Sequence, residues 1–165
     1  MIGALFEWVS PFVYVRLSPD KIHLRNVRSG LNLSEQPLAA ISVQPPARLL
    51  AVGDEAKLHA SETGVKIFNP FTHPRSLVSD FTMAKQVIKG LVRKLLGSSR
   101  YSPSPMIVIH PQVEYAGDFT QVEIRAIREL AMGAGASRVI VWEGRELTDQ
   151  ELLSKSFPRD GRVLE

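Results

Sequence analysis

Two long stretches of the chain have the hydrophobic spacing of amphipathic helices. In residues 80–96 and 118–136, apolar side chains recur every three or four positions, so each helix buries one face. Asp118 is a suitable N-cap or first-turn acid for the second helix, and Gly133 and Gly135 end it. The sequence therefore predicts two long helices, each packed by one side against a larger structure.

Short apolar runs flank the second of these helices. Residues 106–109 precede it and residues 138–142 follow it, and both runs have the length and composition of buried strands. A strand, a helix and a strand joined by short connections form the right-handed crossover unit of a parallel sheet. The rest of the chain is expected to add to this unit.

The N-terminal half predicts a β-meander. Residues 12–17 and 21–27 alternate apolar and polar side chains and are joined by a proline-containing turn, which is the pattern of a hairpin. Further strands are predicted at 38–43, 48–52 and 64–68, and short helices at 54–60 and 147–154, the last with Thr148 as N-cap and Leu152 and Leu153 inward. This order predicts an α/β fold: a mixed sheet with an N-terminal β-meander and helices packed on it.

Length and hydropathy together suggest how the chain is divided. The 165 residues are enough for one domain with a substantial core. We expect a single domain at residues 11–155, preceded by an apolar segment at residues 1–10 and followed by a loose polar tail at residues 156–165.

Composition narrows the function classes. Hydrophobic residues make up 44% and charged residues 22%, as in ordinary soluble domains, and the net charge of +3 is too small to indicate nucleic-acid binding. Cysteine is absent, which excludes disulfides and cysteine-based sites and fits a reducing compartment. No apolar run approaches the roughly 20 residues of a spanning helix, and the start lacks the features of a signal peptide. We therefore expect a cytoplasmic protein with no nucleic-acid partner.

Two features bear on membrane contact. The apolar N-terminal segment either packs on the domain or lies at the inner face of the membrane through Leu5, Phe6 and Trp8, with Tyr101 as a further contact. The polar side of the helix at residues 80–96 carries four basic residues and is either a solvated face or a surface for an anionic partner.

Residues 122–136, VEIRAIREL followed by AMGAGA, resemble a helix-turn signature of the MreB family, the bacterial actin-like rod-shape proteins. Weaker matches to the same family lie at residues 52–57, 69–81 and 31–43. The resemblance covers roughly residues 12–143. It implies a ribonuclease H-like fold that corresponds to the first subdomain of an actin-like ATPase.

The departures from the family concern its nucleotide site. Family members open with Asp-Leu-Gly-Thr, in which the Asp organises the metal and the glycine lets backbone amides approach phosphate. Here Arg16 stands where the Asp is expected, Pro19 removes a donor from the turn, and Asp20 lies on the wrong side of the turn. The second phosphate loop, Asp-Ile-Gly-Gly-Gly-Thr, and the half that holds adenosine are not in this sequence. We therefore expect no cofactor, neither ATP nor magnesium.

Glu123 is the catalytic candidate. The resemblance implies that it matches the family carboxylate that helps to activate the attacking water. Without the phosphate loops it has no substrate, so we expect it to be inactive and paired with Arg125 or Arg128.

The histidines give little indication of a metal site. The four are scattered without metal-ligand spacing. His110 ends a strand, where ligands often bind in α/β sheets, but a lone histidine is more often structural.

These observations favour a non-catalytic, MreB-like accessory protein of the bacterial cell-shape cytoskeleton that acts by protein–protein interaction or self-association. Half of a two-lobed ATPase should expose apolar surface, which is typical of an interface. One alternative is a lobe of a nucleotide-dependent actin-like filament protein that binds ATP only when another chain supplies the second lobe. Another is a peripheral membrane-associated scaffold.

Overall fold

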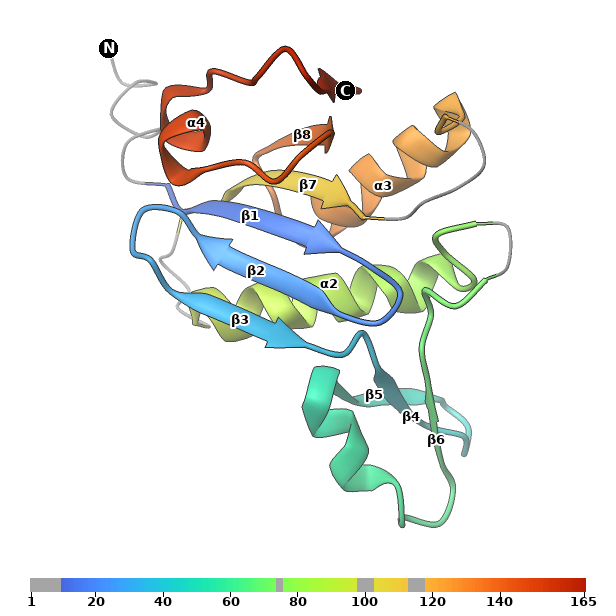
Figure 1. Cartoon of the computed structure of the whole chain (residues 1–165). Coiled ribbons are helices and arrows are strands. Elements are labelled where there is room, and N and C mark those ends of the chain that lie inside the picture. Colours follow the sequence, from blue (N-terminus) through green and yellow to red (C-terminus); the bar gives the residue numbers. More distant parts are fainter. Residues whose placement is uncertain (1–9, 74–75, 98–102, 113–117) are drawn as a thin grey trace.

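The computed structural model describes residues 10–73, 76–97, 103–112 and 118–165. They form a six-stranded sheet in the order β3-β2-β1-β7-β8-β9 and a separate three-stranded sheet in the order β5-β4-β6 (Figure 1). In the large sheet β1 (Phe12–Leu17), β7 (Met106–Pro111) and β8 (Arg138–Glu143) are parallel, whereas β2 (Ile22–Asn26), β3 (Asn32–Glu35) and β9 (Arg162–Val163) pair antiparallel to their neighbours. The sheet is therefore mixed, as the sequence predicts.

The predicted crossover unit is confirmed. Strand β7 leads into α3 (Gln121–Gly133), which leads into β8. The cap differs from the prediction: the N-cap is Thr120, whose hydroxyl accepts from the backbone N–H of Glu123. Asp118 lies before the helix instead and pairs with Arg162 at 3.2 Å.

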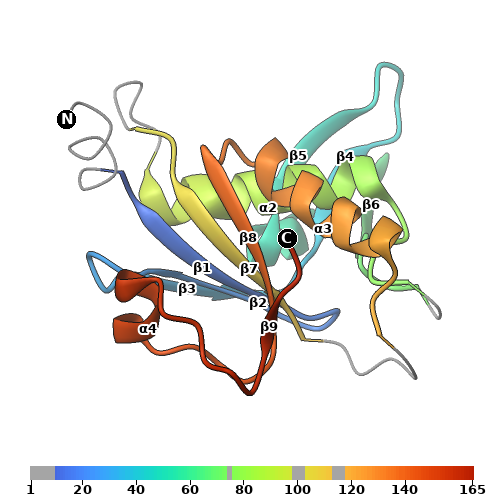
Figure 2. The same ribbon diagram turned by 90° about the horizontal axis from the view of Figure 1, so that it is seen from above.

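Two helices cover one face of the large sheet. The predicted helix at residues 80–96 is α2 (Phe81–Leu96), and the Asp80 carboxylate caps it by accepting from the Met83 N–H at 3.0 Å. Six of its apolar residues are buried, and α2 and α3 lie side by side over the same face (Figure 2). The main core lies between these helices and the sheet and includes Val15, Leu91 and Ile109.

The opposite face of the sheet is covered by the C-terminal part of the chain (Figure 2). A second core there includes Tyr14, Trp142, Leu147 and Leu152, which lies on α4 (Asp149–Ser154). Thr148 caps this helix as predicted, but Leu153 is 48% exposed and does not face inward. The six-residue helix has room for only one such buried position.

The strand at residues 38–43 was expected to be the third strand of the meander, and that assignment is wrong. The third strand of the large sheet is β3, which the sequence did not suggest because only Leu33 in it is apolar. The strand predicted at residues 38–43 is β4 (Ala39–Ser42), and it belongs to the small sheet with β5 (Arg48–Val52) and β6 (Val65–Phe68). The short helix that follows β5 is a 3₁₀ helix, η1 (Gly53–His59).

The loose tail expected at the C-terminus is also not observed. Phe157 stacks on Trp142 with ring centroids 5.5 Å apart, and β9 pairs with β8. Burial of an aromatic ring and pairing of backbone groups order this segment although its composition is polar.

The predicted membrane contacts stay predictions. Leu5, Phe6, Trp8 and Tyr101 lie outside the described residues. Within the described part of the chain, no helix is both long enough and apolar enough to cross a bilayer.

Candidate functional site

The carboxyl ends of the parallel strands meet at one edge of the large sheet, where α/β sheets commonly bind ligands. Arg16 on β1 lies beside His110 on β7 in the strand register. The turn after β1 is short, and the Ser18 hydroxyl donates to the carbonyl of Lys21 at 2.7 Å. These residues stand where the family resemblance implies a metal and a phosphate loop.

The segment after β8 starts at this edge and runs back over the sheet face to α4, which lies near the start of β1 (Figure 1). We call residues 143–149 the crossing segment. Its second residue is Gly144, whose φ of +149° is unfavourable for other residues, and a Cβ there would lie 2.8 Å from both Gly161 and the Trp142 ring. Glycine therefore permits the chain to turn back onto the sheet at this point.

A buried hydrogen-bond chain fixes the crossing segment. The N–H of Leu147 donates to the Tyr14 hydroxyl at 3.2 Å, and that hydroxyl lies 2.7 Å from Nδ1 of His110. The hydroxyl accepts from Leu147 and keeps one proton that it can donate, and donation to Nδ1 requires neutral His110 with Nδ1 unprotonated. Burial lowers the pKa of His110, in agreement with a neutral ring, although a hydrogen bond with the backbone of Gly144 raises it.

Two ion pairs join the crossing segment to the strands. Nη1 of Arg16 lies 2.5 Å from Oε2 of Glu146, and Nη2 of Arg25 lies 2.9 Å from Oδ1 of Asp149. The guanidinium of Arg25 also lies 5.6 Å from the centre of the Tyr14 ring, a cation–π distance. The position expected to hold a metal-binding aspartate thus carries a cation that is paired with a glutamate.

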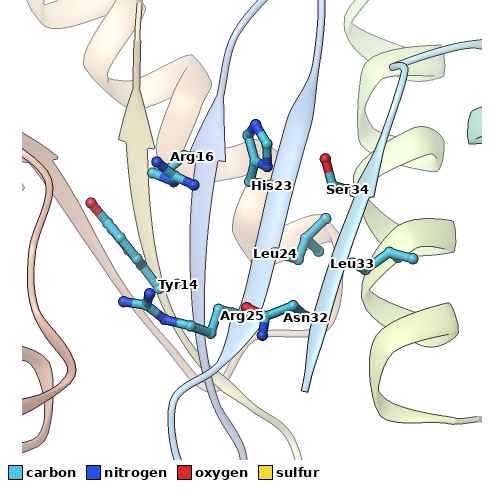
Figure 3. A pocket seen from close by; sticks show the side chains of 8 residues that line it. All are labelled: Tyr14, Arg16, His23, Leu24, Arg25, Asn32, Leu33 and Ser34. Carbon is cyan, nitrogen blue, oxygen red and sulfur yellow. The ribbon is translucent and has the colours of Figure 1, made fainter. Parts of the chain in front are cut away.

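A small pocket of about 60 Å³ opens between β1, β2 and β3 on this face (Figure 3). Arg16, His23 and Ser34 form one row across the three strands, and Tyr14, Arg25 and Asn32 form the next. Burial and the positive charges of Arg16 and Lys21 lower the pKa of His23. The pocket is therefore electropositive and lined mainly by hydrogen-bond donors.

Glu123 does not reach this pocket. Its carboxylate accepts from the Thr120 N–H at 2.9 Å and from the Thr120 hydroxyl at 2.8 Å, which completes a capping box at the start of α3. The predicted ion pair with Arg128 is not formed, because Arg128 lies near Glu129 and Glu165 instead. The local geometry gives Glu123 a role in helix capping.

The histidines are not gathered into a metal site. His59 pairs with Glu62 at 2.8 Å, His23 lines the pocket, and His110 bonds Tyr14. Among the residues that the structure describes, no group of three or more histidine and acidic side chains is arranged to hold a metal ion.

Sequence reasoning missed most of the residues at this site. Tyr14, Arg25, Glu146 and Asp149 meet across more than 120 positions of sequence, so no local spacing connects them. Only Arg16 and His110 carried a signal, since both were expected at strand ends.

Comparisons with known proteins find relatives of this chain by sequence and by structure. The family model described as MreB/Mbl protein matches residues 22–147. Escherichia coli cell shape-determining protein MreB is 31% identical over 117 residues, which is 69% of this chain and 33% of that protein, and the Haemophilus influenzae protein of the same name is 30% identical over 119 residues, 70% and 33% of the two chains. The chain thus spans about a third of the length of these relatives.

A solved structure shares the fold. MreB5 of Spiroplasma citri bound to ADP superimposes with a TM-score of 0.62 at 18% identity, over 81% of this chain and 38% of that chain. This likeness confirms the predicted α/β fold of an actin-like subdomain.

We expect Tyr14→Phe to reduce the free energy of unfolding by about 1–3 kcal/mol. The ring remains packed, but the N–H of Leu147 and Nδ1 of His110 both lose a buried partner. Urea unfolding measures the change. Ser34→Ala, an exposed change on the same face, should stay within about 0.5 kcal/mol, and an equally small loss in Tyr14→Phe would contradict the role of the hydroxyl.

We also expect stability to fall as the pH drops below about 6.5. The pKa of His110 is lowered by burial, so the unfolded chain binds a proton at a higher pH than the folded chain does. The contribution of neutral His110 to the free energy of unfolding is complete above the pKa of this histidine in the unfolded chain. It is lost as the pH falls toward its pKa in the folded chain. In urea unfolding at a series of pH values, His110→Gln should flatten this slope, and the double variant with His23→Gln, whose pKa is lowered too, should flatten it further. An unchanged slope in both variants is the contrary result.

Proposed function

The chain belongs to the MreB/Mbl protein family, a family of cell-shape proteins, and on that premise we propose that it acts by association with other protein molecules and does not hydrolyse nucleotide. The observation that carries the proposal is the Arg16–Glu146 ion pair at the carboxyl edge of the sheet. A cation paired with a glutamate occupies the position where the family resemblance implies a metal-binding aspartate.

The residues at this edge are a poor match for a magnesium nucleotide. Magnesium binds oxygen ligands, mainly carboxylates and phosphates, and the guanidinium of Arg16 repels it. The turn after β1 contains Pro19, which has no N–H to donate to phosphate. The crossing segment, held by Leu147 and Tyr14, lies over the same strands. These three features support the proposal that this family member binds neither ATP nor magnesium.

Exposed aliphatic side chains support an association function. The small sheet and η1 project from the large sheet (Figure 1), and four exposed aliphatic residues lie in or next to them: Val43 (53% exposed), Leu49 (39%), Leu50 (41%) and Leu58 (78%). β5 is also an edge strand of that sheet. Exposed apolar side chains beside an edge strand favour contact with another protein surface. We propose a second copy of the chain as the partner.

A second candidate function is nucleotide binding that another polypeptide completes. It is favoured by the fold shared with Spiroplasma citri MreB5, whose structures are bound to ADP and to AMPPNP. In that alternative Glu123 would contribute to catalysis, and phosphate release would depend on an added second lobe and disappear in Glu123→Gln.

Calorimetric titration of the chain with ATP and magnesium should give no binding in the micromolar range. The reason is that Arg16, a cation, stands where the family resemblance implies a metal-binding aspartate. The titration is repeated with ADP, and circular dichroism verifies that the protein is folded. Micromolar binding of either nucleotide would overturn the non-catalytic proposal and favour the alternative.

Size-exclusion chromatography with light scattering should reveal association that increases with protein concentration. Leu50→Lys should shift the mass toward the monomer, because it places a charge on the apolar edge strand. Leu153→Lys is the matched control, since Leu153 on α4 is similarly exposed at 48%. Equal masses for both variants and the wild type at every concentration would argue against association through the small sheet.

A further inference from the structure

The pocket in Figure 3 concentrates hydrogen-bond donors on one face of three antiparallel strands. Arg16 lies opposite His23, and His23 lies opposite Ser34. Arg25 lies opposite Asn32 in the next row. Each of these side chains can donate an N–H or O–H, and the two arginines are permanent cations. Arg16 and Arg25 are diagonal neighbours with Cβ atoms roughly 7–8 Å apart, so both guanidinium groups can reach one ligand between them.

The positive charges of the two arginines are balanced by acids of the crossing segment. Glu146 pairs with Arg16, and Asp149 pairs with Arg25. The side chains of both acids are about half exposed, at 48% and 51%. Such ion pairs are screened by water and contribute little to stability. The two carboxylates are therefore held weakly enough for another anion to compete with them.

We propose that this pocket binds one phosphate-sized dianion in exchange for Glu146 and Asp149. A dianion replaces two carboxylates, so the total charge at the pocket is unchanged. Its tetrahedral oxygens can accept from Arg16 and Arg25 at once. The cavity volume is about 60 Å³, so the group expected to enter it is small.

The site differs from the turn at the end of β1, because it is lined by residues of β2 and β3. Its ligand is either free phosphate or a phosphate monoester on a larger molecule, which present the same group. Binding releases Glu146 and Asp149 into solvent, and Leu147 then remains as the attachment of the crossing segment to Tyr14. The inference shares the Arg16–Glu146 ion pair with the proposed function, but it requires neither self-association nor the absence of nucleotide hydrolysis.

Calorimetric titration of the full chain with inorganic phosphate tests the proposal, at constant ionic strength and at a slightly alkaline pH where phosphate is a dianion. We expect saturable binding to the wild type. Glu146→Gln should bind roughly two to five times more tightly, because the competing carboxylate is lost. Arg25→Met should bind at least about ten times more weakly, because a charged donor is lost.

Matched controls come from an ion pair away from the pocket. Glu129→Gln and Arg128→Met remove the partners of a surface pair and should leave phosphate affinity unchanged. Circular dichroism verifies that each variant is folded, and the gain expected in Glu146→Gln cannot arise from misfolding. A parallel titration with glycerol 3-phosphate distinguishes the two candidate ligands. An affinity equal to that for inorganic phosphate supports a phosphate monoester as the ligand, and binding of inorganic phosphate alone supports the free ion.

Two results would overturn the proposal. One is the absence of phosphate binding in both the wild type and Glu146→Gln. The other is an affinity in Arg25→Met that equals the affinity in Arg128→Met, because phosphate would then interact with the general charge of the protein and not with this pocket.

Discussion

The buried hydroxyl of Tyr14 is the interaction on which the arrangement of this face depends. A buried polar group without a partner costs roughly 1–3 kcal/mol, and this hydroxyl is satisfied by His110 on one side and by the backbone of Leu147 on the other. The hydrogen bond to Leu147 therefore holds the crossing segment over Tyr14 on β1. Glu146 then meets Arg16, and the acid at the start of α4 meets Arg25 on β2.

The Arg16–Glu146 ion pair lies at the edge of the sheet where the family resemblance implies a nucleotide site. The strands, the helices α2 and α3 and their common core give an actin-like fold. The carboxyl edge of the sheet differs, because a paired cation and a short turn stand where a metal and a phosphate loop are implied. Fold and activity are thus carried by different residues, and a fold can persist after its site has changed.

Local signals in the sequence predicted the elements whose residues lie next to one another in the chain. Helix α2 was predictable because Asp80 caps a long apolar period. The sequence also contains the signal for the cap of α3, since Thr120 and Glu123 have the spacing of a capping box. Asp118 fits a capping position equally well by residue type, so the sequence alone did not decide between Asp118 and Thr120. β3 had no such signal, because it is a polar edge strand with a single apolar side chain.

The sequence by itself determined the helices, most of the strands, the crossover unit and the family, because periodicity, caps and short motifs are properties of neighbouring residues. Only the tertiary structure decided that β4 leaves the large sheet, that the C-terminal tail is ordered on Trp142, and that Arg16 and Arg25 meet the crossing segment. The physical reason is that strand partners, buried hydrogen bonds and ion pairs join residues that are far apart in the chain. Which distant groups meet is set by how the whole core packs.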